Sequence, residues 1–151
     1  MHSLYENFVL EYFKRHHPQL NPTSSWIKWN VEGGMDHLLP YMKTDITLTK
    51  GEKTLIIDTK YYSNIFKTNL YNNEKLHSNN LYQIFSYVKN KDVHNTGNVS
   101  GVLLYAKTNE KISPNCEFMM GKNKIGVRTL DLNKEFKYIV NQLEELLCFL
   151  Q

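Results

Sequence analysis

The sequence has few of the features that mark secreted, membrane-bound or metal-cluster proteins. Only two of its 151 residues are cysteines, Cys116 and Cys148, and they do not form a C-x-x-C pair. This ligand count excludes a cysteine-bound zinc or iron–sulfur cluster and fits a reducing compartment. The first residues, M-H-S-L-Y-E, show no basic segment followed by an apolar core, so we expect no signal peptide. No apolar run approaches the roughly 20 residues that span a bilayer, so we expect a soluble, cytoplasmic protein without a membrane partner.

The excess of positive charge is also small. The net charge is +3, while hydrophobic residues make up 41% of the chain and aromatic residues 13%. This composition is typical of a globular protein, and the length suits one domain over residues 1–151 with a sizeable core. A mildly basic surface permits a phosphate-rich partner but does not require one.

Hydrophobic periodicity predicts an α/β fold. Helical spacing of apolar residues indicates helices over 3–16, 81–89 and 133–151, the second capped by Asn79 or Asn80. Alternating or continuous apolar runs indicate a strand over 26–31, a hairpin over 43–60, and strands over 100–106, 116–120 and 125–132. Residues 61–80 read as a long loop, either one that covers a nucleic-acid groove or one that is simply disordered. The order favours a mixed central sheet with helices on both faces.

Three charged residues in the hairpin are not explained by folding alone. Side chains alternate along a strand, so Asp58 and Lys60 share one face, and Asp45 lies on the opposite arm. Burying unpaired charges there costs several kcal/mol, which implicates a cation or a substrate. The alternative is a surface ion pair of Asp58 and Lys60 on an edge strand, with Asp45 opposite.

The residue types at this place favour a hard divalent cation. Two carboxylates without a nearby histidine or cysteine select Mg²⁺, with Mn²⁺ as a substitute, and the backbone carbonyl of Thr59 is a candidate third ligand. One of the waters that Mg²⁺ keeps would attack a phosphate. Lys60 would hold or deprotonate that water and stabilise the growing charge.

Further candidates lie on the two helices that precede and follow the hairpin. Ser3 and Glu6 match the S-x-x-E capping pattern, but Glu6 also falls at the edge of the apolar face and can point toward the core. Gln83 and Tyr87 are four residues apart and share a helix face. They are solvated if the helix packs on one side only, and point at the hairpin if the helix lies beside it.

The aspartate followed about a dozen residues later by D-x-K, at the end of an apolar strand, resembles the PD-(D/E)xK nuclease superfamily. Within it the chain is similar to the C-terminal nuclease domain of the McrC family, the cleavage subunit of modification-dependent restriction systems. The similarity covers L-Y-E-N-F-V from position 4, the T-D-I of the hairpin, I-I-D-T-K-Y, L-Y-Q-I-F-S-Y from position 81, and G-V-L-L-Y.

This resemblance implies a restriction-endonuclease-like fold and a Mg²⁺-dependent DNA endonuclease that takes part in defence against foreign DNA. It implies that Asp45 and Asp58 bind the metal, that Glu6 adds an acidic group, and that Lys60 is catalytic. Gln83 and Tyr87 match the Q-x-x-x-Y helix motif shared with RecB-type nucleases, which helps place the lysine and the DNA backbone. It also implies an AAA+ GTPase partner of the McrB type, and two copies of the chain for a double-strand break.

Two departures from the family pattern and two alternative functions remain. Thr44 stands where the family usually has proline, and we expect this to alter backbone rigidity more than chemistry. We also expect the N-terminal region that docks on the AAA+ partner to be missing from this chain.

The alternative functions are a RecB-like or Cas4-like repair exonuclease, and a DNA-binding or assembly module that has the fold without turnover.

Overall fold

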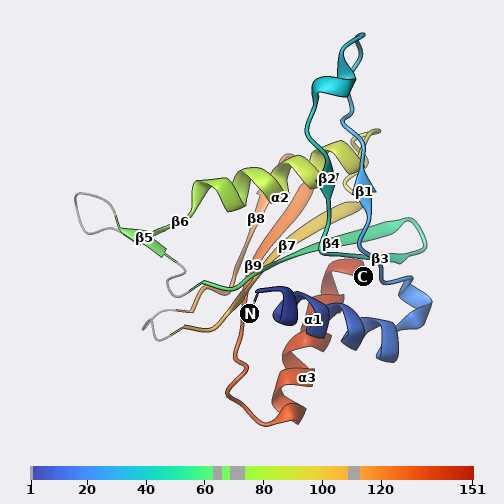
Figure 1. Cartoon of the computed structure of the whole chain (residues 1–151). Coiled ribbons are helices and arrows are strands. Elements are labelled where there is room, and N and C mark those ends of the chain that lie inside the picture. Colours follow the sequence, from blue (N-terminus) through green and yellow to red (C-terminus); the bar gives the residue numbers. More distant parts are fainter. Residues whose placement is uncertain (1, 63–65, 69–73, 109–112) are drawn as a thin grey trace.

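The computed structural model describes residues 2–62, 66–68, 74–108 and 113–151 (Figure 1). The α-helices are α1 (His2–His16), α2 (Ser78–Lys91) and α3 (Phe136–Glu145). The strands are β1 (Trp26–Ile27), β2 (Met42–Lys43), β3 (Ile46–Lys50), β4 (Lys53–Lys60), β5 (Phe66–Thr68), β6 (Glu74–Leu76), β7 (Val99–Ala106), β8 (Cys116–Met120) and β9 (Asn123–Leu130). Short 3₁₀ turns occur at Pro18–Leu20, Asp36–Leu38 and Leu146–Leu150.

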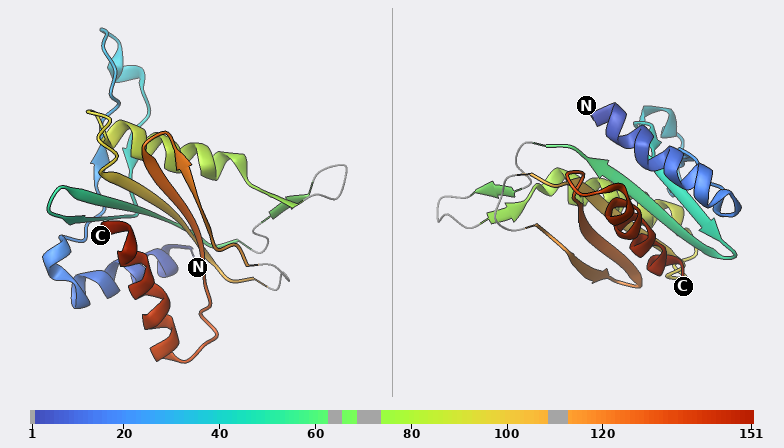
Figure 2. Two further views of the ribbon diagram at one scale, coloured as in Figure 1. Left: turned by 180° about the vertical axis from the view of Figure 1, so that it is seen from behind. Right: turned by 90° about the horizontal axis from the view of Figure 1, so that it is seen from below.

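The centre of the fold is a mixed five-stranded sheet in the order β3-β4-β7-β9-β8. β3 pairs antiparallel with β4, β4 and β9 each pair parallel with β7, and β8 pairs antiparallel with β9. Helix α2 covers one face of the sheet, and α1 and α3 cover the other (Figure 2). The predicted mixed sheet with helices on both faces is therefore confirmed.

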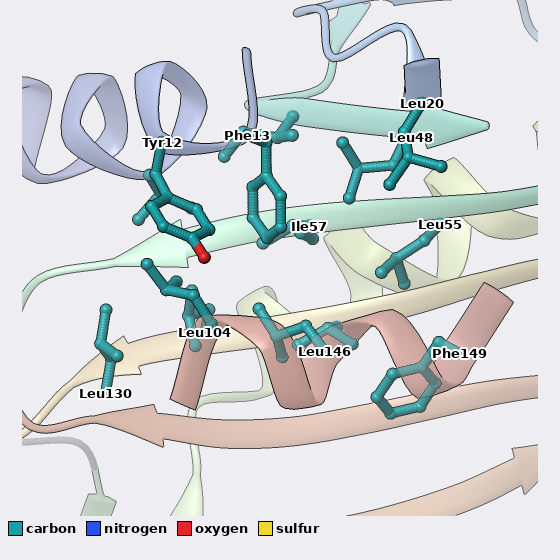
Figure 3. Close-up of a cluster of buried hydrophobic side chains, with 14 of the residues drawn as sticks. Tyr12, Phe13, Leu20, Leu48, Leu55, Ile57, Leu104, Leu130, Leu146 and Phe149 are labelled. Atoms are coloured by element: carbon teal, nitrogen blue, oxygen red, sulfur yellow. The ribbon is translucent and has the colours of Figure 1, made fainter. Parts of the chain in front are cut away.

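The hydrophobic core is split by the sheet into two clusters, and alternation along β4 supplies both. Leu55 and Ile57 belong to the cluster under α1 and α3, where Phe13 and Leu146 are also buried (Figure 3). Ile56 faces the other way, into the cluster that α2 covers. At roughly 1.5–3 kcal/mol for each fully buried aliphatic side chain, this strand contributes strongly to both halves of the core. The consecutive apolar residues of β4 thus reflect its position between two hydrophobic layers.

The close packing of α2 on the sheet depends on a glycine in the central strand. A Cβ atom at Gly101 would lie 2.7 Å from side-chain atoms of both Ile84 and Val88, closer than such contacts normally come. The helix therefore lies against the bare backbone of β7.

The hairpin predicted over 43–60 forms as β3 and β4. Its turn begins at Gly51, whose φ of 60° suits a two-residue hairpin turn and is costly for other residues. Strand β7 runs through the middle of the sheet and is buried along its whole length, as its apolar run predicted.

The prediction of a strand over 26–31 is largely wrong, because only Trp26–Ile27 pairs, with Met42–Lys43. Beyond Ile27 the chain leaves the sheet and returns through the exposed turn at Asp36–Leu38, forming a projecting arm (Figure 1). The Trp29 indole N–H donates to the carbonyl of Pro40 at 2.7 Å and ties the two sides of this arm together.

The loop predicted over 61–80 needs a correction too. β5 and β6 pair with each other there, and α2 begins at Ser78, three residues before its predicted start. The predicted asparagine caps are wrong, since His77 is the N-cap residue and makes no side-chain cap hydrogen bond. Residues 63–65 and 69–73 of the predicted loop lie outside the described residues.

The C-terminal helix is shorter than predicted. α3 spans Phe136–Glu145, and the chain then tightens into the 3₁₀ turn Leu146–Leu150. Among the helices of the described part of the chain, none combines the length and apolar character that crossing a bilayer requires.

Candidate active site

The charged pair of the hairpin lies at the carboxyl end of β4, between two neighbouring strands. Asp58 and Lys60 are only 2% and 9% exposed, and Lys60 Nζ lies 2.9 Å from Asp58 Oδ2. In register they stand beside Leu103 and Tyr105 of the parallel strand β7. A solvated ion pair on an edge strand, the alternative considered from the sequence, is therefore wrong.

The environment of Asp58 makes its carboxyl group harder to ionise than that of a solvated aspartate. Burial is the largest cause and, with the charge of Asp45, raises the pKa of Asp58 to about 7, while Lys60 opposes this rise. Asp58 Oδ2 faces the Lys60 ammonium at 2.9 Å, and no other group among the described residues donates to this buried oxygen. An ionised carboxylate has about four acceptor positions, so Asp58 can bind a further positive group beside Lys60.

Lys60 is held from the other side by α2. Its ammonium donates to Gln83 Oε1 at 2.7 Å, and Gln83 Nε2 donates in turn to the hydroxyl of Tyr87 at 2.8 Å. Since the tyrosine hydroxyl accepts from the amide nitrogen, the amide oxygen is left facing the lysine. Gln83 and Tyr87 thus point at the hairpin, the second of the two arrangements that the sequence allowed.

Asp45 reaches across the hairpin from the first arm. Its Oδ2 accepts hydrogen bonds from the backbone N–H of Thr59 at 2.8 Å and from the Thr59 hydroxyl at 2.9 Å. The Thr59 carbonyl, the predicted third metal ligand, accepts instead a 2.8 Å hydrogen bond from His2 Nε2. A carbonyl oxygen has a second lone pair, so this bond leaves it one further position.

Thr44, where the resemblance leads one to expect proline, anchors the backbone before Asp45. Its N–H donates to the carbonyl of Ser25 at 2.8 Å, and its hydroxyl oxygen accepts from the N–H of Ser25 at 2.9 Å. Proline has no N–H and could not make the first of these bonds. The rigidity at this position is therefore supplied by hydrogen bonds.

Glu6 looks toward Asp45 rather than capping its own helix. α1 begins at His2, before Ser3, and ligand atoms of His2, Glu6 and Asp45 all lie within 4.8 Å of one another. Burial is the main cause that raises the pKa of Glu6, and Asp45 adds to it, against the lowering effect of His2, Lys43 and Lys60. The position of Glu6 at the edge of the apolar face of α1 therefore brings its carboxylate close to Asp45.

His2 is the residue that sequence reasoning missed. The cation was chosen on the assumption that no histidine is near, and the cluster with Glu6 and Asp45 contradicts this. The available signal was the i, i+4 spacing of His2 and Glu6 on one helix, which places both on the same face.

The residues present fit a divalent cation. Carboxylates of Asp45, Asp58 and Glu6 come from three separate segments toward one region: Glu6 clusters with Asp45, and Asp45 in turn acts on the buried Asp58. Oxygen ligands of this kind suit Mg²⁺ or Mn²⁺, and an imidazole beside them suits Mn²⁺ better than Mg²⁺.

A mixed sheet between helices, with acids and a lysine at the carboxyl end of β4, defines a restriction-endonuclease-like α/β fold. Residues 1–106 match the family model described as McrBC 5-methylcytosine restriction system component. The chain belongs to this family.

One relative agrees with this placement, and a solved structure shares the fold. The chain is 34% identical over 149 residues to the type IV methyl-directed restriction enzyme EcoKMcrBC of Escherichia coli K12, covering 97% of this chain and 42% of the relative. In fold it is similar to a chain of the tetradecameric assembly of Thermococcus gammatolerans McrB AAA+ hexamers with bound McrC, with a TM-score of 0.61 and 19% identity. That likeness covers 97% of this chain and 32% of the neighbour. The chain thus spans less than half the length of either relative.

Proposed function

We propose that this chain is a Mg²⁺-dependent DNA endonuclease that hydrolyses phosphodiester bonds as part of a McrBC-like restriction system. The observation that carries the proposal is that Glu6 clusters with Asp45, Asp45 acts on Asp58, and Asp58 lies beside one lysine whose ammonium is held in place by Gln83. Structural ion pairs do not need a third acid from a separate helix, whereas phosphoryl transfer needs a cation site and an adjacent positive group.

Asp45, Asp58 and Glu6 would hold the ion, with the Thr59 carbonyl as a further ligand. When bound, Mg²⁺ supplies the positive charge that activates a water and neutralises the phosphate. The water oxygen forms a bond to phosphorus and gives up a proton, while the bond from phosphorus to the leaving oxygen breaks and that oxygen takes up a proton.

The chain's own groups orient this reaction. Lys60 lies next to the acids, so its ammonium is in position to stabilise negative charge on a phosphate oxygen. Gln83 takes one of the three N–H groups of Lys60 and leaves the others for Asp58 and a substrate. Tyr87 fixes the orientation of the Gln83 amide.

The proposal includes a partner. The fold neighbour occurs in an assembly of McrB AAA+ hexamers with bound McrC, and this chain is of the same family. We therefore place it with a McrB-type AAA+ GTPase that selects the modified DNA, while this chain supplies cleavage, and two copies act for a double-strand break.

The test is cleavage of methylated and unmethylated closed circular DNA, by the chain alone and together with the McrB-type partner. Cleavage should appear with Mg²⁺ or Mn²⁺ and disappear with EDTA. Asp58→Asn and Lys60→Met should each lower the rate at least a hundredfold, because each removes a charge that the transition state needs. Lys50→Met, at the far end of the same hairpin, is the matched control and should cleave normally.

Three outcomes count against this assignment. Cleavage of linear but never of closed circular DNA would identify an exonuclease instead. DNA binding without metal-dependent cleavage under any of these conditions would identify a binding module. Undiminished cleavage by both Asp58→Asn and Lys60→Met would remove the site from the reaction.

A further inference from the structure

The base of the projecting arm carries two exposed aromatic side chains beside a lysine. Trp26 is 62% exposed and Tyr41 is 92% exposed. Their ring centroids are 5.6 Å apart with an interplanar angle of 69°, and Lys43 Nζ lies 4.8 Å from the centroid of the Trp26 ring. We call Trp26, Tyr41 and Lys43 the aromatic corner.

The register of β1 and β2 shows that the corner is not left over from core packing. Trp26 is paired with Lys43, and Tyr41 precedes Lys43 by two positions, so the three side chains share one face. The neighbouring pair, Ile27 and Met42, faces the other way and is buried under α2. The two strands therefore already pack one apolar face into the core, and the aromatic corner lies on their opposite face, which is exposed to solvent.

The corner is rigidly connected to the acid site. Only Thr44 separates Lys43 from Asp45, and Thr44 is 1% exposed and doubly hydrogen-bonded to Ser25. The charge of Lys43 opposes the net rise in the pKa of Glu6, so its ammonium is within electrostatic reach of the acids. A ligand on the corner would therefore reach toward the site where a phosphate is proposed to react.

We infer that the aromatic corner stacks an unpaired nucleobase of the DNA strand whose neighbouring phosphate enters the acid site. Tyr41 supplies the stacking face, Trp26 supports its edge, and Lys43 contacts a phosphate. The base must be unpaired, because in a continuous duplex both faces of each base are covered by neighbours. This inference rests on the proposed nuclease function and adds a binding site to it.

The chemistry of the corner favours nucleic acid over a protein partner. Aromatic rings interleaved with a cation bind the two parts of a nucleotide, since the base stacks and the phosphate is neutralised. The more purely apolar exposed residues, Met35 and Leu38, lie further out on the arm. A protein partner would be expected to use those residues.

The experiment measures binding without cleavage. Fluorescence anisotropy of a labelled oligothymidylate is followed in EDTA, and is compared with an abasic strand of the same length and with a blunt duplex. Tyr41→Ala should weaken binding of the oligothymidylate roughly 5- to 150-fold, the range for loss of one stacked base, and should leave the weak abasic binding unchanged. Tyr41→Phe should bind normally.

The matched control is Tyr138→Ala. Tyr138 is 48% exposed and has Lys137 Nζ 5.1 Å from its ring centroid, so it presents the same kind of pair on α3. Its replacement should leave the affinity unchanged. Thermal melting of each variant checks that the fold is retained.

Trp26 provides a direct signal, because the chain has only two tryptophans. In a Trp29→Phe variant the remaining emission comes from Trp26, and oligothymidylate should quench it while the abasic strand should not. Should Trp29→Phe not fold, the anisotropy series in the natural chain still decides the question.

Equal affinity for the abasic and the base-bearing strand would overturn the inference, as would equal losses in Tyr41→Ala and Tyr138→Ala. Unchanged DNA binding by Tyr41→Ala together with lost binding of the McrB-type partner would reassign the corner to protein docking. Because no cleavage enters these measurements, failure of the nuclease proposal would appear separately, in the metal-dependent cleavage assay.

Discussion

The hydrogen-bond chain from Lys60 through Gln83 to Tyr87 predicts two unequal losses of activity. Gln83→Leu removes the acceptor of a charged donor, a bond of roughly 1.5–3 kcal/mol, so the rate of the cleavage step should fall roughly 10- to 150-fold. Tyr87→Phe removes only a neutral bond of about 1 kcal/mol and frees the Gln83 amide to turn, which should lower the rate roughly fivefold. The hydrogen-bond chain therefore predicts that Gln83→Leu lowers the rate more than Tyr87→Phe does, as well as the size of each loss.

Single-turnover cleavage at saturating Mg²⁺, with the McrB-type partner present, isolates the chemical step from product release. Tyr82→Phe on the same helix is the control. Tyr82 is 67% exposed, so this substitution removes an equivalent hydroxyl group without affecting Lys60. The double variant of Gln83→Leu and Tyr87→Phe should be no slower than Gln83→Leu alone, since Tyr87 acts through Gln83.

A larger loss in Tyr87→Phe than in Gln83→Leu would refute this reasoning. Such a result would mean that the tyrosine hydroxyl contacts the substrate directly. Additive losses in the double variant would lead to the same conclusion.

Two predictions concern stability. Burial would raise the pKa of Asp92, but hydrogen bonds from Asn123, Thr96 and Gly97 outweigh it and lower the pKa to about 2. Because the folded-state pKa lies below the unfolded value, this stabilisation is present above about pH 4 and is lost as the pH falls toward 2. Urea unfolding at a series of pH values gives the free energy of unfolding of the natural chain and of Asp92→Asn. The difference between the two should shrink by about 2 kcal/mol over that window, and a difference that stays constant would contradict the argument. Gly126→Ala would place a Cβ 2.5 Å from the ring of Phe149, so it should cost about 1–3 kcal/mol and be partly relieved by an added Phe149→Leu, whereas an unchanged urea midpoint would show that the C-terminal turn is loosely held.

The parts of the fold that were predictable from the sequence are those with a strong local period. The alternation in β4 separates Leu55 and Ile57 from Ile56, so the facing of Asp58 and Lys60 followed without coordinates. The four-residue spacing of Gln83 and Tyr87 likewise predicted that they act on the same side of α2. The spacing did not show whether these two side chains face solvent or the hairpin, because the lateral position of a helix depends on packing between distant segments.

The errors have physical causes of the same kind. Residues 28–31 continue the alternation of a strand, but a strand also needs a backbone partner, and β2 offers only two residues for pairing. His2 was overlooked because ligands were sought around the hairpin, while its contact with Thr59 spans 57 positions of the sequence. A contact of that range has no signature in local composition.

The bare backbone at Gly101 has a consequence for the lysine. Ile84, which rests against this glycine, is the direct neighbour of Gln83 along α2. Any side chain on the central strand at this point would lift the helix, and the amide would withdraw from the ammonium that it orients. The smallest residue of β7 thus sets the height of α2 above the sheet, and with it the reach of Gln83 to Lys60.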